Sequence, residues 1–110
     1  MAQAYKVLGQ VAPSDTNLTT LYTVPSATQT VVSTISVANI TNASAVYSIA
    51  IRTNGDAIEN KHYIAYEVGL GANDSISLTI GIALQATDVL SVKSGTSDAF
   101  AFQAFGVEES

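Results

Sequence analysis

His62 is the only histidine in the chain, and it stands beside Lys61 at the start of an expected strand. An imidazole is the side chain best suited to general acid–base chemistry near neutral pH. No partner accompanies it in the sequence, and no serine lies in a nucleophile-elbow motif. A Ser-His-Asp arrangement formed only on folding stays open in so serine-rich a chain, but no motif supports it. We therefore interpret His62 as a surface or edge residue and predict that the protein is not an enzyme.

Two further groups of residues resemble binding sites only in part. Asn54, Asp56 and Glu59 share one loop and offer the oxygen donors that calcium accepts, but their spacing differs from that of an EF-hand. The run 69–71 begins like a dinucleotide fingerprint, yet Asp74 stands where the third glycine belongs and a strand follows. A solvated loop and a turn explain both groups more simply, so we predict no metal and no cofactor.

The composition points to a protein that is covered by neighbours. Charged residues make up 12% of the 110 residues, against about 25% in ordinary globular domains, and Ser, Thr and Ala take their place. A surface of small side chains suits burial in an assembly better than free dispersion. The net charge is −5 with four Lys and Arg residues, which argues against binding to nucleic acid. No run approaches the roughly 18 apolar residues of a membrane helix, so we expect a soluble protein.

Alternation of apolar and polar residues is the main structural signal. In the stretch 63–92, Ile64, Tyr66, Val68 and Leu70 share one face of a strand, and Ile76, Leu78, Ile80 and Ile82 share one face of the next. The longest candidate strand is 28–39. In it, Val31, Ile35 and Val37 are expected to face one way and Thr30, Thr34 and Ser36 the other. The remaining candidates are 5–11, 19–24, 46–53, about 90–92 and 99–107.

Eight short strands without a helical period predict an all-β fold, a two-sheet antiparallel sandwich that is jelly-roll-like. Residues 1–110 are one domain, in which 1–12 form either an N-terminal arm or a first strand. Only 57–61 could form a single helical turn, the alternative being an irregular loop. Phe100 and Phe102 lie on one face of the last strand, and Phe105 and Val107 on the other. We therefore expect that strand to be central, or to be an edge pressed against a neighbouring subunit.

Five segments carry a further signal: LYTVPS (21–26), VVSTISVAN (31–39), KHYIAYEVGLGANDSISLTIGIAL (61–84), TDVLSV (87–92) and AFGVE (104–108). Together they resemble a known group of proteins, the small virion proteins of tailed phages, including cyanophages. The resemblance spans about 20–108 and implies a sandwich or jelly-roll subunit, commonly a homotrimer, that decorates or cements a capsid. It implies the major capsid protein or other virion proteins as partners, and a place on the capsid surface after synthesis in the host cytoplasm. Such proteins have no fixed active site, so no functional residue is transferred.

Two other functions fit the sequence. A phage tail or fibre protein would share the same patterns, although the short chain leaves no room for a fibre shaft and so favours decoration of the head. A carbohydrate-binding module is the alternative from a different class, in which an aromatic platform would stack against a sugar. Its candidates are the five tyrosines Tyr5, Tyr22, Tyr47, Tyr63 and Tyr66.

The residues expected to contact a partner are those that the alternation directs outward. Most are small and uncharged, which suits a surface that another subunit covers. An aromatic in the N-terminal segment and one on the last strand complete the set. The predicted contact residues are Tyr5, Tyr63, Ala65, Ser75, Ser77, Thr79, Ser91 and Phe105.

Overall fold

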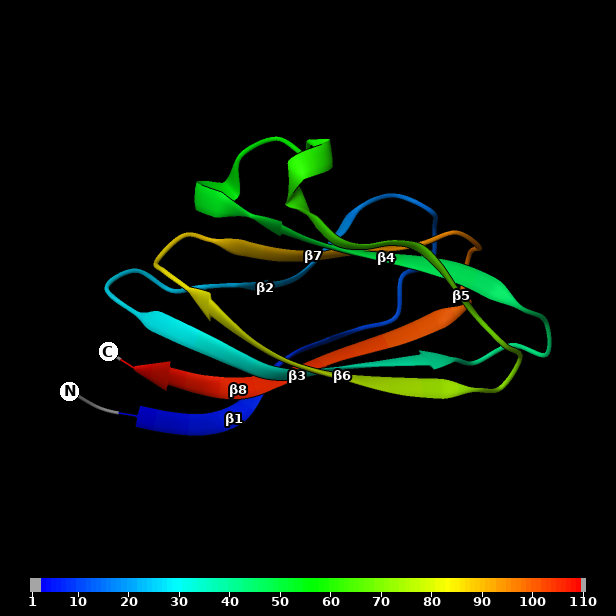
Figure 1. Ribbon diagram of the computed structural model, residues 1–110, viewed down its shortest axis with the longest axis horizontal. Coiled ribbons are helices and arrows are strands. Elements are labelled where there is room, and N and C mark those ends of the chain that lie inside the picture. The colour runs from blue at the N-terminus through cyan, green and yellow to red at the C-terminus, as the bar shows by residue number, and fades with distance from the viewer. Residues whose placement is uncertain (1–2, 110) are drawn as a thin grey trace.

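Two antiparallel four-stranded sheets pack face to face in the computed structural model, which describes residues 3–109 (Figure 1). The predicted all-β sandwich is confirmed. Two short 3-10 turns, η1 (Thr53–Gly55) and η2 (Asn60–His62), lie between the fourth and fifth strands. The strands are β1 (Gln3–Val11), β2 (Thr19–Thr23), β3 (Gln29–Asn39), β4 (Ala45–Arg52), β5 (Tyr63–Leu70), β6 (Ser75–Leu84), β7 (Val89–Ser94) and β8 (Phe100–Glu109).

The strand order is that of a jelly roll. The first sheet has the order β1-β8-β3-β6, and the second has the order β2-β7-β4-β5. The pairs β1 with β8, β2 with β7, β3 with β6 and β4 with β5 are nested, as in one long hairpin whose tip is the β4–β5 connection. Folding that hairpin over itself gives the two packed sheets. The segment at 3–11 is thus a first strand and not an arm, and β8 is central, between β1 and β3.

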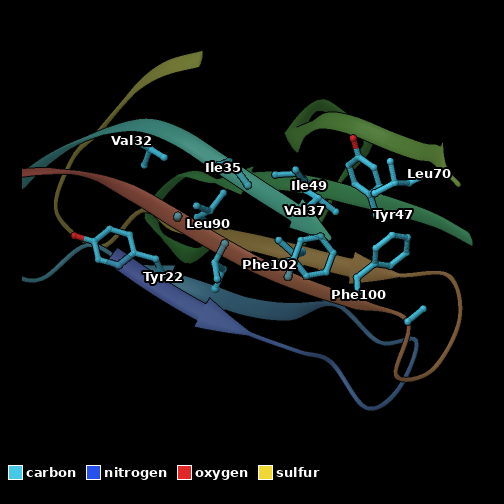
Figure 2. Packing of buried hydrophobic residues seen from close by; sticks show 14 of the residues in the cluster. Tyr22, Val32, Ile35, Val37, Tyr47, Ile49, Leu70, Leu90, Phe100 and Phe102 are labelled. Atoms are coloured by element: carbon cyan, nitrogen blue, oxygen red, sulfur yellow. The ribbon is translucent and has the colours of Figure 1, made fainter. Parts of the chain in front are cut away.

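The core lies between the sheets, and aromatic side chains from both fill one end of it (Figure 2). Phe100 and Phe102 of β8 are fully buried, and the ring of Tyr47 of β4 packs edge-on at centroid distances of 5.6 Å and 6.4 Å from them. Such edge-to-face pairs add to the gain from apolar burial. Aliphatic side chains complete the cluster, among them Val32, Ile35, Val37, Ile49, Leu70, Leu90 and Val92.

β5 departs from the predicted alternation. Ile64 and Tyr66 are 48% and 61% exposed, and of the four residues predicted to share a face only Leu70 is buried. The pairing of β4 with β5 shifts register twice, on either side of Ile49. Glu67 adopts a φ of 48°, and its N–H donates a hydrogen bond to Ser48 Oγ (2.9 Å) instead of joining the regular ladder. Each irregularity adds a residue to one strand and exchanges its faces, so the prediction for β5 is wrong.

A similar irregularity changes the start of β3. Thr30 is buried and Val31 is exposed, the reverse of the expected arrangement, because the register of β3 against both neighbours shifts between Val32 and Thr34. After the shift, Ile35 and Val37 point into the core as predicted. The alternation of β6 is confirmed, since Leu78, Ile80 and Ile82 pack against the core.

Candidate interaction surface

The outer face of the first sheet carries a row of exposed apolar side chains. Tyr5 of β1 pairs with Val107 of β8, Val107 pairs with Val31 of β3, and Val31 pairs with Ala83 of β6. These four residues therefore stand side by side across all four strands. Tyr5 is 81% exposed, and Val31 is exposed as well. Val7 and Phe105, themselves a cross-strand pair, form the start of a second row.

A shallow hollow of about 460 Å³ lies between these two rows, lined by residues of β1, β3 and β8 that include Tyr5, Ser33 and Phe105. Exposed small side chains of β6 extend the surface. Among residues 3–109, the one charged side chain that the strand register places on this side of the sheet is Glu109, at its margin, where Gln3 donates it a hydrogen bond (2.8 Å). We call this surface the uncharged face; it comprises Tyr5, Val7, Val31, Ser33, Ser75, Ser77, Thr79, Ala83, Phe105 and Val107.

The nearest cation is Lys6, which also lines the hollow. Lys6 pairs with Gly106, whose side of the sheet faces the core, and its ammonium forms an ion pair with Glu108 (2.7 Å). Tyr22 of the second sheet also donates a hydrogen bond to Glu108 (2.5 Å). These two bonds, that from Lys6 first, lower the pKa of Glu108. The charges of Lys6 and Glu108 are thus paired with each other at the end of the sandwich.

The predicted contact residues separate into three groups: five lie on the uncharged face, one lies at the edge of the other sheet, and two are covered within the protein. Tyr5, Ser77 and Phe105 lie together on the uncharged face, as do Ser75 and Thr79.

Tyr63 is half-buried at the edge of the other sheet. Ala65 packs against the core, because the register shifts of β5 turn it inward, so its predicted outward position is wrong. Ser91 is fully buried, although it alternates with the core residues Leu90 and Val92. The side chain of Arg52 covers it, and Arg52 Nε donates a hydrogen bond to Ser91 Oγ (3.2 Å). Its prediction as a contact residue is also wrong.

Five residues of the uncharged face were not among the predicted contact residues: Val7, Val31, Ser33, Ala83 and Val107. For two of these residues, Val107 and Val7, the sequence contains a partial signal. Val107 was assigned to the strand face opposite to that of Phe100, and Val7 shares a strand face with Tyr5. For Val31 there was no usable signal, because a β-branched apolar residue in a long strand reads as core until the register shift in β3 is known.

His62 is buried, with 5% of its surface exposed, which contradicts the predicted surface position. The backbone N–H of Glu59 donates a hydrogen bond to His62 Nδ1 (2.9 Å), and this contact closes the η2 turn. Within residues 3–109, Nε2 has no hydrogen-bond partner, so neither a serine nor a carboxylate is placed to form a triad. His62 therefore acts as a cap for the turn.

The predicted calcium-like loop is held by contacts within the protein. Thr87 Oγ1 donates a hydrogen bond to Asn54 Oδ1 (2.7 Å), and Arg52 donates one to the backbone oxygen of Asp56 (3.1 Å). In the described part of the chain, no three His, Asp or Glu side chains are grouped to hold a metal ion. Asn54 thus serves to join η1 to the β6–β7 turn.

The five tyrosines do not form one platform. Tyr22 and Tyr47 belong to the core, and Tyr5 lies on the first sheet. Tyr63 and Tyr66, both on β5, pack edge to face with ring centroids 4.8 Å apart. They line a hollow of about 490 Å³ together with Asn60. An aromatic site for a sugar is therefore limited to this pair.

No protein-family model matches the sequence, and no curated protein is significantly similar to it. Within residues 3–109 the chain has no helix that is long and apolar enough to cross a membrane. The uncharged face extends over all four strands of the first sheet.

Proposed function

We propose that this protein is a structural subunit that decorates the capsid of a tailed phage, with its uncharged face laid against the shell where capsid subunits meet. One observation carries the proposal: an exposed sheet face in which an apolar row crosses all four strands and the charged side chain is confined to the margin. A surface depleted in charge and anchored by an aromatic is typical of the centre of a protein–protein interface. The resemblance to phage virion proteins supports the choice of partner.

The mechanism is passive. Covering the apolar row contributes about 25 cal/mol for each Å² of apolar surface removed from water. Tyr5 is the natural anchor, because a rigid, largely exposed aromatic buries a large area at low entropic cost. Each subunit contributes modestly, but repetition over a lattice multiplies the gain. Expansion or rupture of the shell then requires that all of these contacts break.

Binding to purified phage heads tests this proposal with a matched pair of variants. Tyr5→Ser should weaken binding by about thirtyfold or more, since truncating a hot-spot aromatic costs about 2 kcal/mol or more. Tyr66→Ser, a substitution of another exposed tyrosine on the opposite sheet, should leave binding unchanged.

Quantitative mass spectrometry of intact virions gives an independent measurement. The proposal expects a copy number near that of the major capsid protein, and retention on heads without tails. A few copies per particle, found only with tails, would assign the protein to the tail or a fibre instead.

A second candidate function is binding of carbohydrate at Tyr63 and Tyr66. The observation that favours it is the pair of partly exposed rings beside a polar side chain, Asn60, at one hollow. Aromatic faces and amide groups together suit a sugar ring and its hydroxyls. A glycan array should then show binding that Tyr66→Ser abolishes and Tyr5→Ser preserves, and an array without signal would exclude this function.

A further inference from the structure

β6 is an edge strand that lacks the charged residue or proline by which many strand edges are protected from pairing; its irregularity is a register shift against β3 between Thr79 and Ile82. It forms one margin of the first sheet, is ten residues long, and contains neither a charged residue nor a proline. Natural edge strands are commonly kept short, or carry a lysine, a proline or an inward charge. The other three edges have such features. β1 carries Lys6, β5 carries Glu67 in a bulge, and β2 has only five residues before Pro25.

The sandwich is also open beside β6. β1 and β2 contact each other and close the opposite side, whereas β5 and β6 diverge from the turn that joins them (Figure 1). Val68 pairs with the core residue Tyr47, and Ile76 shares a strand face with Leu78, yet each is 38% exposed. Leu78, Ile80 and Ile82 are only partly buried. Apolar side chains that face inward thus remain accessible along this side.

We propose that a second copy of this chain pairs with β6, antiparallel to it and across a two-fold axis at Thr79. The proposed pairing uses residues 75–83, which end before the buried Leu84, and Thr79 is their centre. In this register Ile76 faces Ile82 of the second copy, and Leu78 faces its Ile80. On the outer side Thr79 faces Thr79, Ser77 faces Gly81 and Ser75 faces Ala83. Large residues meet large ones and small residues meet small ones, so the strand is complementary to itself.

The charge and the area favour a second copy as the occupant. A chain with a net charge of −5 can approach itself most easily along a strand that has no charge. Nine paired residues extend about 30 Å, and two sheets stacked about 10 Å apart with their side chains present a side roughly 20 Å high. The interface is then on the order of 600 Å² per copy, close to the roughly 800 Å² of a standard specific interface.

The pairing is isologous and closes at two copies. It would join the two first sheets into one continuous sheet, and because the axis is perpendicular to that sheet, both uncharged faces would point the same way. The inference stands independently of the proposed function. It differs from the trimer that the phage resemblance implies, so the mass in solution separates the two.

Sedimentation equilibrium of the full chain tests the pairing. We expect the mass of a dimer, and we expect Thr79→Lys to raise the dimer dissociation constant by at least about tenfold, because it places two like charges across the axis. Thr20→Lys is the matched control, as Thr20 is exposed on edge strand β2 and should leave the constant unchanged. A monomer up to millimolar concentration, a trimer, or an equal effect of both variants would overturn the proposal.

A cysteine variant gives a second readout that does not depend on weakening the interface. The chain has no cysteine, so a disulfide formed by Thr79→Cys must join two copies. Directly opposed residues of antiparallel strands have Cα atoms about 4.5–5.5 Å apart, within the range that a disulfide spans. Mild oxidation should yield a covalent dimer from Thr79→Cys and none from Thr20→Cys. Failure of Thr79→Cys to cross-link while folded would also overturn the pairing.

Discussion

The hydroxyl of Tyr22 donates a hydrogen bond to Glu108 Oε2 at 2.5 Å, and it thereby links the two sheets of the sandwich. The same hydroxyl lies 2.8 Å from Thr30 Oγ1, and Lys6 forms an ion pair with the other oxygen of Glu108. Burial, with Glu108 as the next cause, raises the pKa of Tyr22 to about 12. Figure 2 shows the ring of Tyr22 at one end of the core cluster. A polar network therefore closes this end of an otherwise apolar core.

Tyr22→Phe should lower the free energy of unfolding by about 2 kcal/mol at neutral pH, because a hydrogen bond to a charged group is worth roughly 1.5–3 kcal/mol. Urea unfolding measures this change. Tyr47→Phe is the matched control, since among residues 3–109 the hydroxyl of Tyr47 has no hydrogen-bond partner. The control should change stability by less than about 0.5 kcal/mol. Equal losses in the two variants would mean that the network at Glu108 contributes nothing specific.

Acid should destabilise the protein partly through Glu108. The folded state lowers the pKa of this carboxyl below its ordinary 4.5, first through Lys6 and then through Tyr22. Its contribution is therefore present above pH 4.5 and is lost as the pH falls through the folded-state value. Lys6→Gln should flatten the decline of unfolding free energy between pH 5 and 3, by less than about 1 kcal/mol since Lys6 is half-exposed. Parallel pH curves for the two proteins would contradict this role of Lys6.

Ala27→Gly should stabilise the fold. Ala27 is exposed and has a φ of 54°, a left-handed conformation that costs a residue with a Cβ about 1–2 kcal/mol. Glycine relieves that cost but loses about 0.4–1 kcal/mol through the entropy of the unfolded chain, so the net gain should be about 0.5–1 kcal/mol. The same change at exposed Ala72, whose φ is not positive, should destabilise by a similar amount. Thermal and urea unfolding of both variants would show opposite signs.

Gly106→Ala should be severely destabilising. An added Cβ would lie 2.0 Å from the backbone oxygen of Val31 on the neighbouring strand, which cannot move without breaking the first sheet. We expect a loss of more than about 3 kcal/mol, or failure to fold. A Cβ added at Gly81, on edge strand β6, would have no other atom within 4 Å. The Gly81→Ala protein should therefore fold with nearly unchanged stability. A well-folded Gly106→Ala protein would show that β3 and β8 can separate at this point.

The sequence could predict much of the candidate surface, but not its full membership. Tyr5, Ser75, Ser77, Thr79 and Phe105 lie on the faces that alternation within their own strands indicates. Ala65 and Ser91 fail for two different reasons. A bulge reversed the first, and the side chain of Arg52, which comes from the adjacent strand, covers the second. Neither event has a signature within the strand that it affects.

By itself, the sequence determined the all-β class, the number of strands and the faces of β6 and β8, because a two-residue period is a local property of the chain. Only the tertiary structure decided the nesting of strands, the exposure of Val31 and the burial of His62. Strand order and register depend on contacts between residues far apart in sequence, such as Tyr22 with Glu108. The open side at β6 likewise exists only once two sheets have packed and left one edge uncovered.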